Sequence, residues 1–297
     1  MNRNRLKNPR LMMIVAMTLF GTIGLFVKKI PISSGEISLY RGILAILPIG
    51  AVLFLTGQKL NYAEIKKEIL LLLLSGAAMG FNWILLFESY KHTTVSLATI
   101  SYYFAPVLVT IACPIIFKER MNLKQWICFI MSTLGILLIT GSVDLSGGSN
   151  HLLGISLALG AAVLYASVVI FNKLIKTVEG LHRTMIQFLA AVAVLFPYVA
   201  ATGGFHITEL TGVGWGYLLI VGFIHTGITY CLYFSSLKEL PGQKAAILSY
   251  IDPLVAVLVS VLILGEGMTV MQVIGGALIL GFTLWNEIAS RERRQSK

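Results

Sequence analysis

Long hydrophobic runs, separated by short polar connections, dominate the chain. Ten such runs can be marked, at residues 11–28, 35–56, 69–90, 94–117, 123–141, 153–175, 182–201, 213–236, 243–265 and 269–289. A helix of about 20 apolar residues spans the hydrocarbon core of a bilayer. Because lipid offers the backbone no hydrogen-bond partners, runs of this length are expected to be helical. The pattern predicts an all-α integral membrane protein with ten transmembrane helices.

The composition agrees with a membrane protein. Of the 297 residues, 57% are hydrophobic and only 12% are charged, whereas about 25% of a soluble chain is charged. Cys113, Cys128 and Cys231 all lie inside apolar runs and fit no metal-binding spacing, so they are expected to be small buried residues. We expect no metal and no cofactor.

The net charge of +10 is distributed unevenly among the connections. If the ten runs cross the membrane in alternating directions, both termini lie on the same side of it. Nineteen of the 23 lysines and arginines then fall on that side. Cytoplasmic connections carry such an excess. The bias predicts a multi-pass protein of the cell (plasma or inner) membrane with cytoplasmic N and C termini, and it explains the basic charge without nucleic acid.

One stretch occurs twice, 147 residues apart. Identical residues at this offset include Tyr103/Tyr250, Pro106/Pro253, Glu119/Glu266 and Gln125/Gln272. The repeating unit holds five predicted helices, an odd number, so the second copy must lie upside down relative to the first. The sequence therefore predicts two inverted five-helix repeats, residues 1–147 and 148–297, around a central cavity, an architecture that many secondary transporters share.

A doubled Tyr-x-x-Pro segment that continues to a Glu, near the ends of the fourth and ninth runs, resembles the EamA group of the drug/metabolite transporter superfamily. The resemblance covers about residues 10–287. It implies a transporter of small metabolites, often an exporter of amino acids or drugs, with a substrate cavity between the two repeats. It does not imply one particular substrate.

Several polar side chains lie within the predicted membrane helices. A charge there costs about 2.5–3.5 kcal/mol on insertion scales, so such residues are functional candidates. Those selected are Arg41, Asn82, Glu88, His225 and Asp252. At the offset of 147, the acids and the histidine align with small residues, so they break the repeat symmetry in the way that an asymmetric substrate requires.

Aromatic residues and prolines complete the candidate set. The aromatic residues expected to line the cavity are Trp83, Tyr102, Tyr103, Tyr230 and Tyr250. Pro106 and Pro253 each remove a backbone hydrogen bond and are expected to shape the cavity or to act as hinges. Glu119 and Glu266 recur in both repeats, so we expect them to make structural contacts at helix ends.

The preferred functional hypothesis is a secondary transporter that moves an amino acid or a related amphipathic metabolite, in the export direction, by alternating access. Arg41 could bind a carboxylate in a bidentate manner, and Glu88 or Asp252 could bind an ammonium group. Asp252 and His225 are candidates for a coupling proton. The partners expected are the substrate and the bilayer, with the protein a monomer or a weak homodimer.

Three alternatives remain open at this level. A cationic-drug exporter would use Asp252 and Glu88, but would fit Arg41 only if that residue were paired. An intramembrane enzyme would need a catalytic motif that the apolar runs do not supply, and a structural membrane protein or receptor would not explain inverted repeats. Asp252 could also pair permanently with His225 or Arg41, and Glu88 could reach the surface beside Lys91.

Overall fold

The computed structural model describes residues 8–57, 62–117, 121–142, 150–178, 180–240 and 242–295, and all regular structure within them is helical. The helices of the first half are α1 (Pro9–Val27), α2 (Ser34–Leu55), α3 (Tyr62–His92), α4 (Val95–Tyr102), α5 (Ala105–Phe117) and α6 (Leu123–Gly141). The second half contains α7 (His151–Leu174), α8 (Gly180–Thr202), η1 (Ile207–Glu209), α9 (Gly212–Leu219), η2 (Ile220–Ile228), α10 (Thr229–Leu237), α11 (Gly242–Ser249), α12 (Ile251–Leu262) and α13 (Val270–Gln295).

The prediction of an all-α membrane protein is confirmed, while the helix count stays a prediction. Within the described ranges, nine helical stretches are long and apolar enough to cross a membrane. This count takes α4 and α5 as one stretch, and α9, η2 and α10 as another. In the region of the predicted run 243–265 the apolar helix is shorter and covers Ile247–Leu262. Large hydrophobic side chains such as Leu47, Phe54 and Ile115 are exposed on the outside of the bundle, as lipid contact requires.

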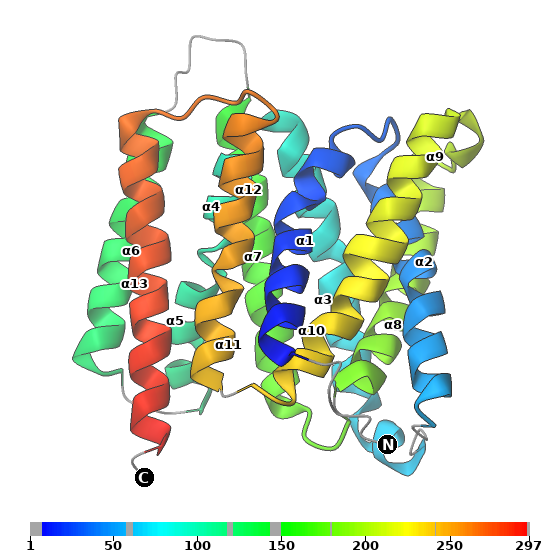
Figure 1. Ribbon diagram of the computed structural model, residues 1–297, viewed down its shortest axis with the longest axis horizontal. Helices are drawn as coiled ribbons and strands as arrows, with labels where there is room; N and C mark the ends of the chain where they lie inside the picture. Colours follow the sequence, from blue (N-terminus) through cyan, green and yellow to red (C-terminus); the bar gives the residue numbers. More distant parts are fainter. Residues whose placement is uncertain are drawn as a thin grey trace.

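The helices of the two halves interleave. Helix α1 packs on α12 and α10, α2 on α8 and η2, α3 on α7 and α8, and α6 on α13. Figure 1 shows α6 and α13 side by side at one edge of the bundle and α2, α8 and α9 at the other. Helix α1 begins and α13 ends toward the same, lower end of that view.

Glycines permit the closest helix contacts. A Cβ added at Gly135 would lie 2.6 Å from the carbonyl oxygen of Gly275, and the reverse distance is also 2.6 Å. A Cβ at Gly21 of α1 would lie 2.5 Å from the carbonyl oxygen of Asp252 in α12. Small residues allow backbones to approach in this way in membrane proteins, where packing rather than water drives helix association.

The repeated glutamines cap equivalent helices. Gln125 and Asn122 form a capping box at the start of α6, with Asn122 N donating to Gln125 Oε1 at 2.8 Å. Gln272 and Thr269 bond reciprocally just before α13, with Thr269 N donating to Gln272 Oε1 at 2.9 Å. Both arrangements satisfy backbone N–H groups that a helix start leaves without partners.

The two repeated Tyr-x-x-Pro segments interrupt their helices at matching places. The first interruption separates α4 from α5 at Tyr103 and Phe104, and the second separates α11 from α12 at Tyr250. Each proline then lies in the first turn of the following helix, where its missing N–H has no intrahelical acceptor to lose. The sequence pattern marked both segments, but it placed each inside one continuous helix, and the structure shows two shorter helices instead.

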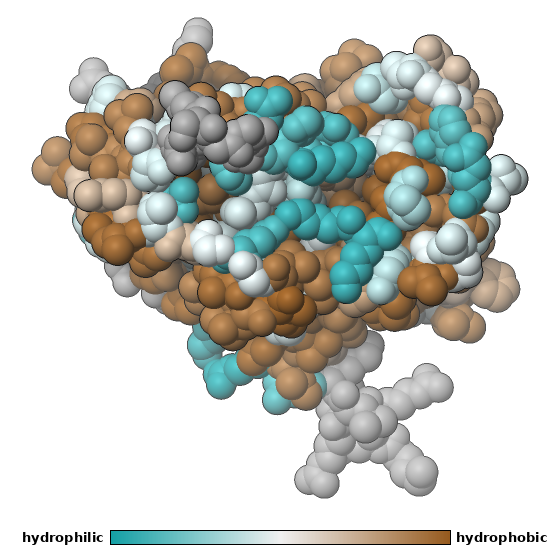
Figure 2. All heavy atoms as spheres, turned by 90° about the horizontal axis from the view of Figure 1, so that it is seen from above, coloured by the Kyte–Doolittle hydropathy of each residue, from teal (hydrophilic) through white to brown (hydrophobic). Residues whose placement is uncertain are grey.

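The upper end of the molecule carries a polar surface. Seen from above, hydrophilic residues gather across the middle of this face and hydrophobic residues surround them (Figure 2). Lys28 and Lys29 follow the end of α1, and Lys91 lies in the last turn of α3. A hydrophilic end face with a hydrophobic rim is what a bundle needs at the membrane surface.

Candidate functional site

A cavity of about 470 Å³ lies inside the bundle. It is bounded by residues of α1 to α5, α7 and α10 to α13. Its aromatic wall consists of Phe20, Trp83, Phe87, Tyr90, Tyr102, Tyr103, Tyr165, Tyr230, Tyr233 and Tyr250, and its polar side chains are Arg41, Asn82, Thr99, Thr110, Ser249, Asp252 and Glu287. Pockets for small ligands have this volume and this mixture of aromatic walls with few polar groups.

Eight of the ten predicted binding residues line this cavity, and two do not. The eight are Arg41, Asn82, Trp83, Tyr102, Tyr103, Tyr230, Tyr250 and Asp252. Glu88 and His225 lie elsewhere, as described below. Proximity to a cavity does not test substrate binding, so the binding roles stay predictions.

Arg41 is a buried cation on the cavity wall. Its side chain is 4% exposed, and its Nε donates to Thr226 Oγ1 at 3.0 Å. The guanidinium carbon lies 4.4 Å from the ring centre of Trp83 and 5.0 Å from that of Phe87, so both rings contribute cation–π attraction. Within the described residues, Arg41 has no carboxylate within 4.0 Å and no acceptor for its two Nη atoms.

Asp252 is the acidic counterpart in the first turn of α12. Tyr103 Oη donates a hydrogen bond to Asp252 Oδ2 at 2.7 Å. The carboxylate also benefits from its place at the start of a helix, where the helix dipole is positive. Among the described residues Asp252 forms no ion pair with Arg41 or His225, so the acid and the cation line the same cavity without pairing.

The tyrosines form a connected aromatic lining. Ring centres lie 5.5 Å apart for Tyr102 and Tyr165, and 6.3 Å apart for Tyr103 and Tyr250. Tyr230 packs against Phe20 at 5.3 Å and Phe188 at 5.2 Å. The two tyrosines of the repeat, Tyr103 and Tyr250, therefore meet across the cavity although 147 residues separate them in sequence.

Asn82 and Trp83 are held in place by neighbours of the second half. Asn82 Nδ2 donates to the carbonyl oxygen of Ala161 in α7 at 2.6 Å. Trp83 packs edge-on against Phe188 of α8, with 5.2 Å between ring centres. Both contacts anchor α3 to the second half and fix the direction of these side chains at the cavity wall.

His225 lies in η2, away from the cavity. It is 2% exposed, its Nε2 lies 2.9 Å from Thr22 Oγ1, and its Nδ1 lies 3.2 Å from the carbonyl oxygen of Ile220. Its ring packs on Phe26 with 4.9 Å between centres. Both ring nitrogens thus have partners, which is the arrangement of a satisfied buried histidine joining α1 to η2.

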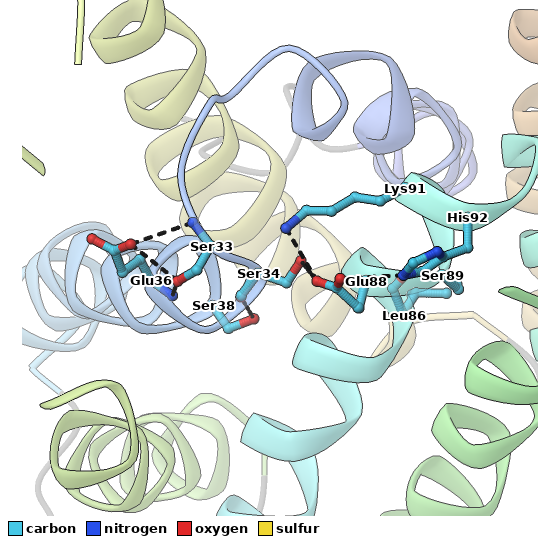
Figure 3. A network of polar contacts seen from close by, with 9 residues as sticks. All are labelled: Ser33, Ser34, Glu36, Ser38, Leu86, Glu88, Ser89, Lys91 and His92. Atoms are coloured by element: carbon cyan, nitrogen blue, oxygen red, sulfur yellow. Dashed lines mark hydrogen bonds and ion pairs between the residues drawn. The ribbon is translucent and has the colours of Figure 1, made fainter. Parts of the chain in front are cut away.

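Glu88 lies near the end of α3 and does not line the cavity. Figure 3 shows its contacts. It accepts a hydrogen bond from Ser34 Oγ at 2.7 Å and pairs with Lys91 at 3.1 Å and His92 at 3.4 Å. The pairing with Lys91 is the arrangement that the sequence left open for this acid. Figure 3 also shows the capping box of Ser33 and Glu36 at the start of α2.

Glu266 connects three helices at the upper end of the molecule. It pairs with Lys28 at the end of α1, accepts from Val95 N of α4 at 2.8 Å, and accepts from Ser260 Oγ of α12. Its sequence counterpart Glu119 lies outside the described residues. The contacts of Glu266 are of the helix-end kind expected for a structural role.

Several cavity residues were not among the sequence candidates. Tyr90 and Tyr165 lie in strongly apolar runs and have no aromatic residue at the repeat offset, so the pattern did not select them. Glu287 was not selected because it lies near the end of the last run. Helical spacing gives a signal for Tyr90, which follows Trp83 and Phe87 at seven and three residues and shares their face of α3.

No metal cluster is evident in the described part of the chain, where no three His, Cys, Asp or Glu side chains come together. The polar groups that line the cavity are one guanidinium, carboxylates, an amide and hydroxyl groups, and they lie beside aromatic faces.

Comparison with known proteins gives a consistent picture. A sequence model of the EamA-like transporter family matches residues 9–141 and again residues 152–286. An uncharacterized transporter of Bacillus subtilis, YxxF, is 30% identical over 269 residues, which cover 90% of this chain and 85% of the relative. A protein of Salmonella typhimurium named "Probable amino-acid metabolite efflux pump" is 27% identical over 195 residues, covering 61% of this chain and 64% of its own.

A solved structure shares the fold. It superposes with a TM-score of 0.63 at 16% sequence identity, and the match covers 96% of this chain and 98% of the other. At this level of identity the likeness concerns the arrangement of helices only.

Proposed function

The chain belongs to the EamA-like transporter family, and from that membership we propose that it is a secondary transporter of an amino acid or a related amphipathic metabolite. Membership, together with the transporter names of its relatives, indicates transport of a small molecule across a bilayer rather than enzymatic catalysis. The family resemblance found in the sequence is thereby confirmed. The substrate class, the direction and the mechanism are the proposal.

The observation that carries the substrate class is the pair of separate opposite charges in one cavity. Arg41 has free Nη atoms and no carboxylate partner among the described residues, and Asp252 is held only by Tyr103. An amino acid carries a carboxylate and an ammonium group, which complement these two side chains. Charge-assisted hydrogen bonds of this kind are the strong ones, and the aromatic wall offers an apolar surface to the substrate side chain.

Export by alternating access fits several features. The relative from Salmonella carries an efflux name. The family model matches twice, and the helices α4/α5 and α11/α12 break at equivalent tyrosines. We accordingly propose ten spans in two inverted five-helix repeats, residues 1–147 and 148–297, with cytoplasmic termini in the cell membrane. Pro106 and Pro253 would act as the hinges, and Asp252 is the better placed candidate for a coupling proton because it lines the cavity.

A second function of the same superfamily is an exporter of cationic drugs. Asp252, surrounded by tyrosines, has the chemistry to bind an organic cation. Arg41, which has no carboxylate partner among the described residues, argues against it, because a buried cation in the same cavity repels a cationic substrate. The two proposals therefore differ in what Arg41 contributes.

A ligand screen on detergent-purified protein separates them. A ligand that binds the folded state raises the melting temperature by mass action, so we expect amino acids to stabilise the wild type and Arg41→Gln and Asp252→Asn each to weaken the binding about tenfold or more. Lys238→Gln and Glu209→Gln are matched controls, since they make the same charge changes at exposed positions away from the cavity. If only organic cations stabilise the protein and Arg41→Gln responds like the wild type, the amino-acid proposal is wrong.

A further inference from the structure

The segment η2, which faces α2, is a π-helix. This wide form of helix is rare in proteins, and where it occurs it is often at a functional site. Two of its side chains, and that of Thr229 directly after it, bond to the carbonyl oxygen five residues earlier. His225 Nδ1 lies 3.2 Å from the oxygen of Ile220, and the hydroxyls of Thr226 and Thr229 donate to Val221 and Ile224, both at 2.7 Å. The side chains thus follow the widened turn of the backbone.

Helix α2 fits closely against this segment. A Cβ at Gly222 would lie 2.5 Å from Cβ of Leu44, and Gly227 lies directly against the ring of Pro48. Arg41, Leu44 and Pro48 are spaced by three and four residues and so share one face of α2. This face of α2 therefore packs on Gly222 and Gly227 of η2. The close packing brings Arg41 against Thr226, which lies between the two glycines in the sequence.

Thr226 is completely buried and does not itself line the cavity. Its hydroxyl donates to Val221 and accepts from Arg41 Nε, so its single proton and one lone pair are both in use. The direction of the hydroxyl is fixed by the π-helix. Because the Nε edge of the guanidinium is occupied, only the edge formed by Nη1 and Nη2 can bind a carboxylate with two hydrogen bonds.

We infer that Thr226 is a positioning residue, which holds Arg41 so that its Nη1–Nη2 edge receives the substrate carboxylate end-on. The inference rests on the proposed function, because it assigns a carboxylate to the cavity. It adds that specificity for the carboxylate depends on a side chain that never touches the substrate. Trp83 and Phe87 hold the faces of the guanidinium, and Thr226 holds its edge.

The variants that test this inference differ in one hydroxyl. Thr226→Val keeps the shape and removes both hydrogen bonds, and Thr226→Ser keeps the hydroxyl. Thr229→Val is the matched control, because Thr229 is also completely buried and also bonds to a carbonyl oxygen of the π-helix, but is not hydrogen-bonded to Arg41. Binding is measured with an amino acid found to stabilise the wild type and with its C-terminal amide, which lacks the carboxylate.

We expect Thr226→Val to weaken binding of the amino acid about tenfold and to leave binding of the amide within twofold. Thr226→Ser and Thr229→Val should bind both ligands like the wild type. If Thr226 had only a structural role, Thr226→Val would weaken the binding of both ligands, and Thr229→Val would weaken it as well. Equal loss for both ligands, or no loss at all in Thr226→Val, would overturn the inference.

A second measurement needs no ligand. In protein labelled with ¹⁵N-arginine, the Nε–H of Arg41, assigned through Arg41→Gln, should exchange slowly with water in the wild type and in Thr226→Ser and faster in Thr226→Val. If no amino acid binds the wild type, the proposed function fails while this test still decides the positioning of Arg41. Equal exchange in the wild type and Thr226→Val would contradict it.

Discussion

A buried charge without a counter-charge is the most informative feature at the scale of single residues. Arg41 is held by one hydroxyl and two aromatic faces, and its side chain lines the cavity. Desolvation of a charge is costly unless hydrogen bonds and opposite charge compensate it. We therefore interpret Arg41 as a residue whose compensation is completed by substrate.

A different buried charge, Glu36, is fully compensated within the protein. It is 0% exposed, caps its own helix with Ser33 and accepts from the backbone N of His206 at 2.5 Å. Glu36→Ala removes one half of the capping box and leaves the part-buried N–H of His206 without its carboxylate acceptor, so we expect it to destabilise the fold by about 1–3 kcal/mol. Reversible unfolding monitored by circular dichroism measures this, with the exposed Glu209→Ala as control. Equal stability of the two variants would contradict the structural role.

At the scale of helices, the contact between α1 and α12 supports one wall of the cavity. Gly21 lies against the carbonyl of Asp252 and the side chain of Val255, and nothing in that contact can move aside easily because one partner is backbone. The distance between these helices therefore also sets the position of the Asp252 carboxylate.

We expect Gly21→Ala to push α1 away from α12, to lower stability by about 1–3 kcal/mol and to weaken binding of an ammonium-bearing ligand. Gly281→Ala in α13 is the control, since a Cβ there meets nothing within 4 Å and alanine favours a helix over glycine by roughly 1 kcal/mol. Thermal shift and ligand titration of both variants provide the measurement. A Gly21→Ala protein as stable as Gly281→Ala would show that α1 and α12 are not so tightly joined.

At the scale of the whole molecule, the central cavity borders a smaller pocket toward the upper end. A second pocket of about 270 Å³ there is lined by Lys28, Lys91, Phe87 and Tyr90, and the last two residues also line the central cavity. The ion pair of Lys28 with Glu266 lies at this end and joins α1 to the segment after α12. Phe87 and Tyr90 thus border both spaces, and the ion pair holds together helices that lie beside them.

Loss of this ion pair should favour opening at the upper end. We expect Glu266→Gln to increase, by several-fold, the rate at which Tyr90→Cys reacts with a membrane-impermeant thiol reagent added from that side, because a weaker contact shifts the population toward the open state. The background protein lacks Cys113, Cys128 and Cys231, and Glu209→Gln serves as control. An unchanged rate in Glu266→Gln would mean that other contacts keep the cavity closed.

Hydrophobic periodicity and the internal repeat predicted much of this architecture. The contacts between helices and the π-helix could not be predicted from these patterns. The apolar runs located the helices, and the symmetry filter found Asp252, which lines the cavity. Helical spacing left open that Glu88 pairs with Lys91, three residues on in α3. Sequence alone could not tell that His225 faces Thr22, because a different helix supplies that contact. The π-helix was equally hidden, since its signal is a set of threonine bonds to carbonyls and not a hydrophobic pattern.

Because the two halves interleave, the peptide link between them should not be needed for assembly. Helices α1, α2, α3 and α6 all find major partners in the second half, so most of what holds either half in shape is an interface with the other. Two separate polypeptides, residues 1–142 and 150–297, should therefore assemble into a working heterodimer when they are made together. Made singly, each should be degraded by protease, because the partner that completes its fold is missing.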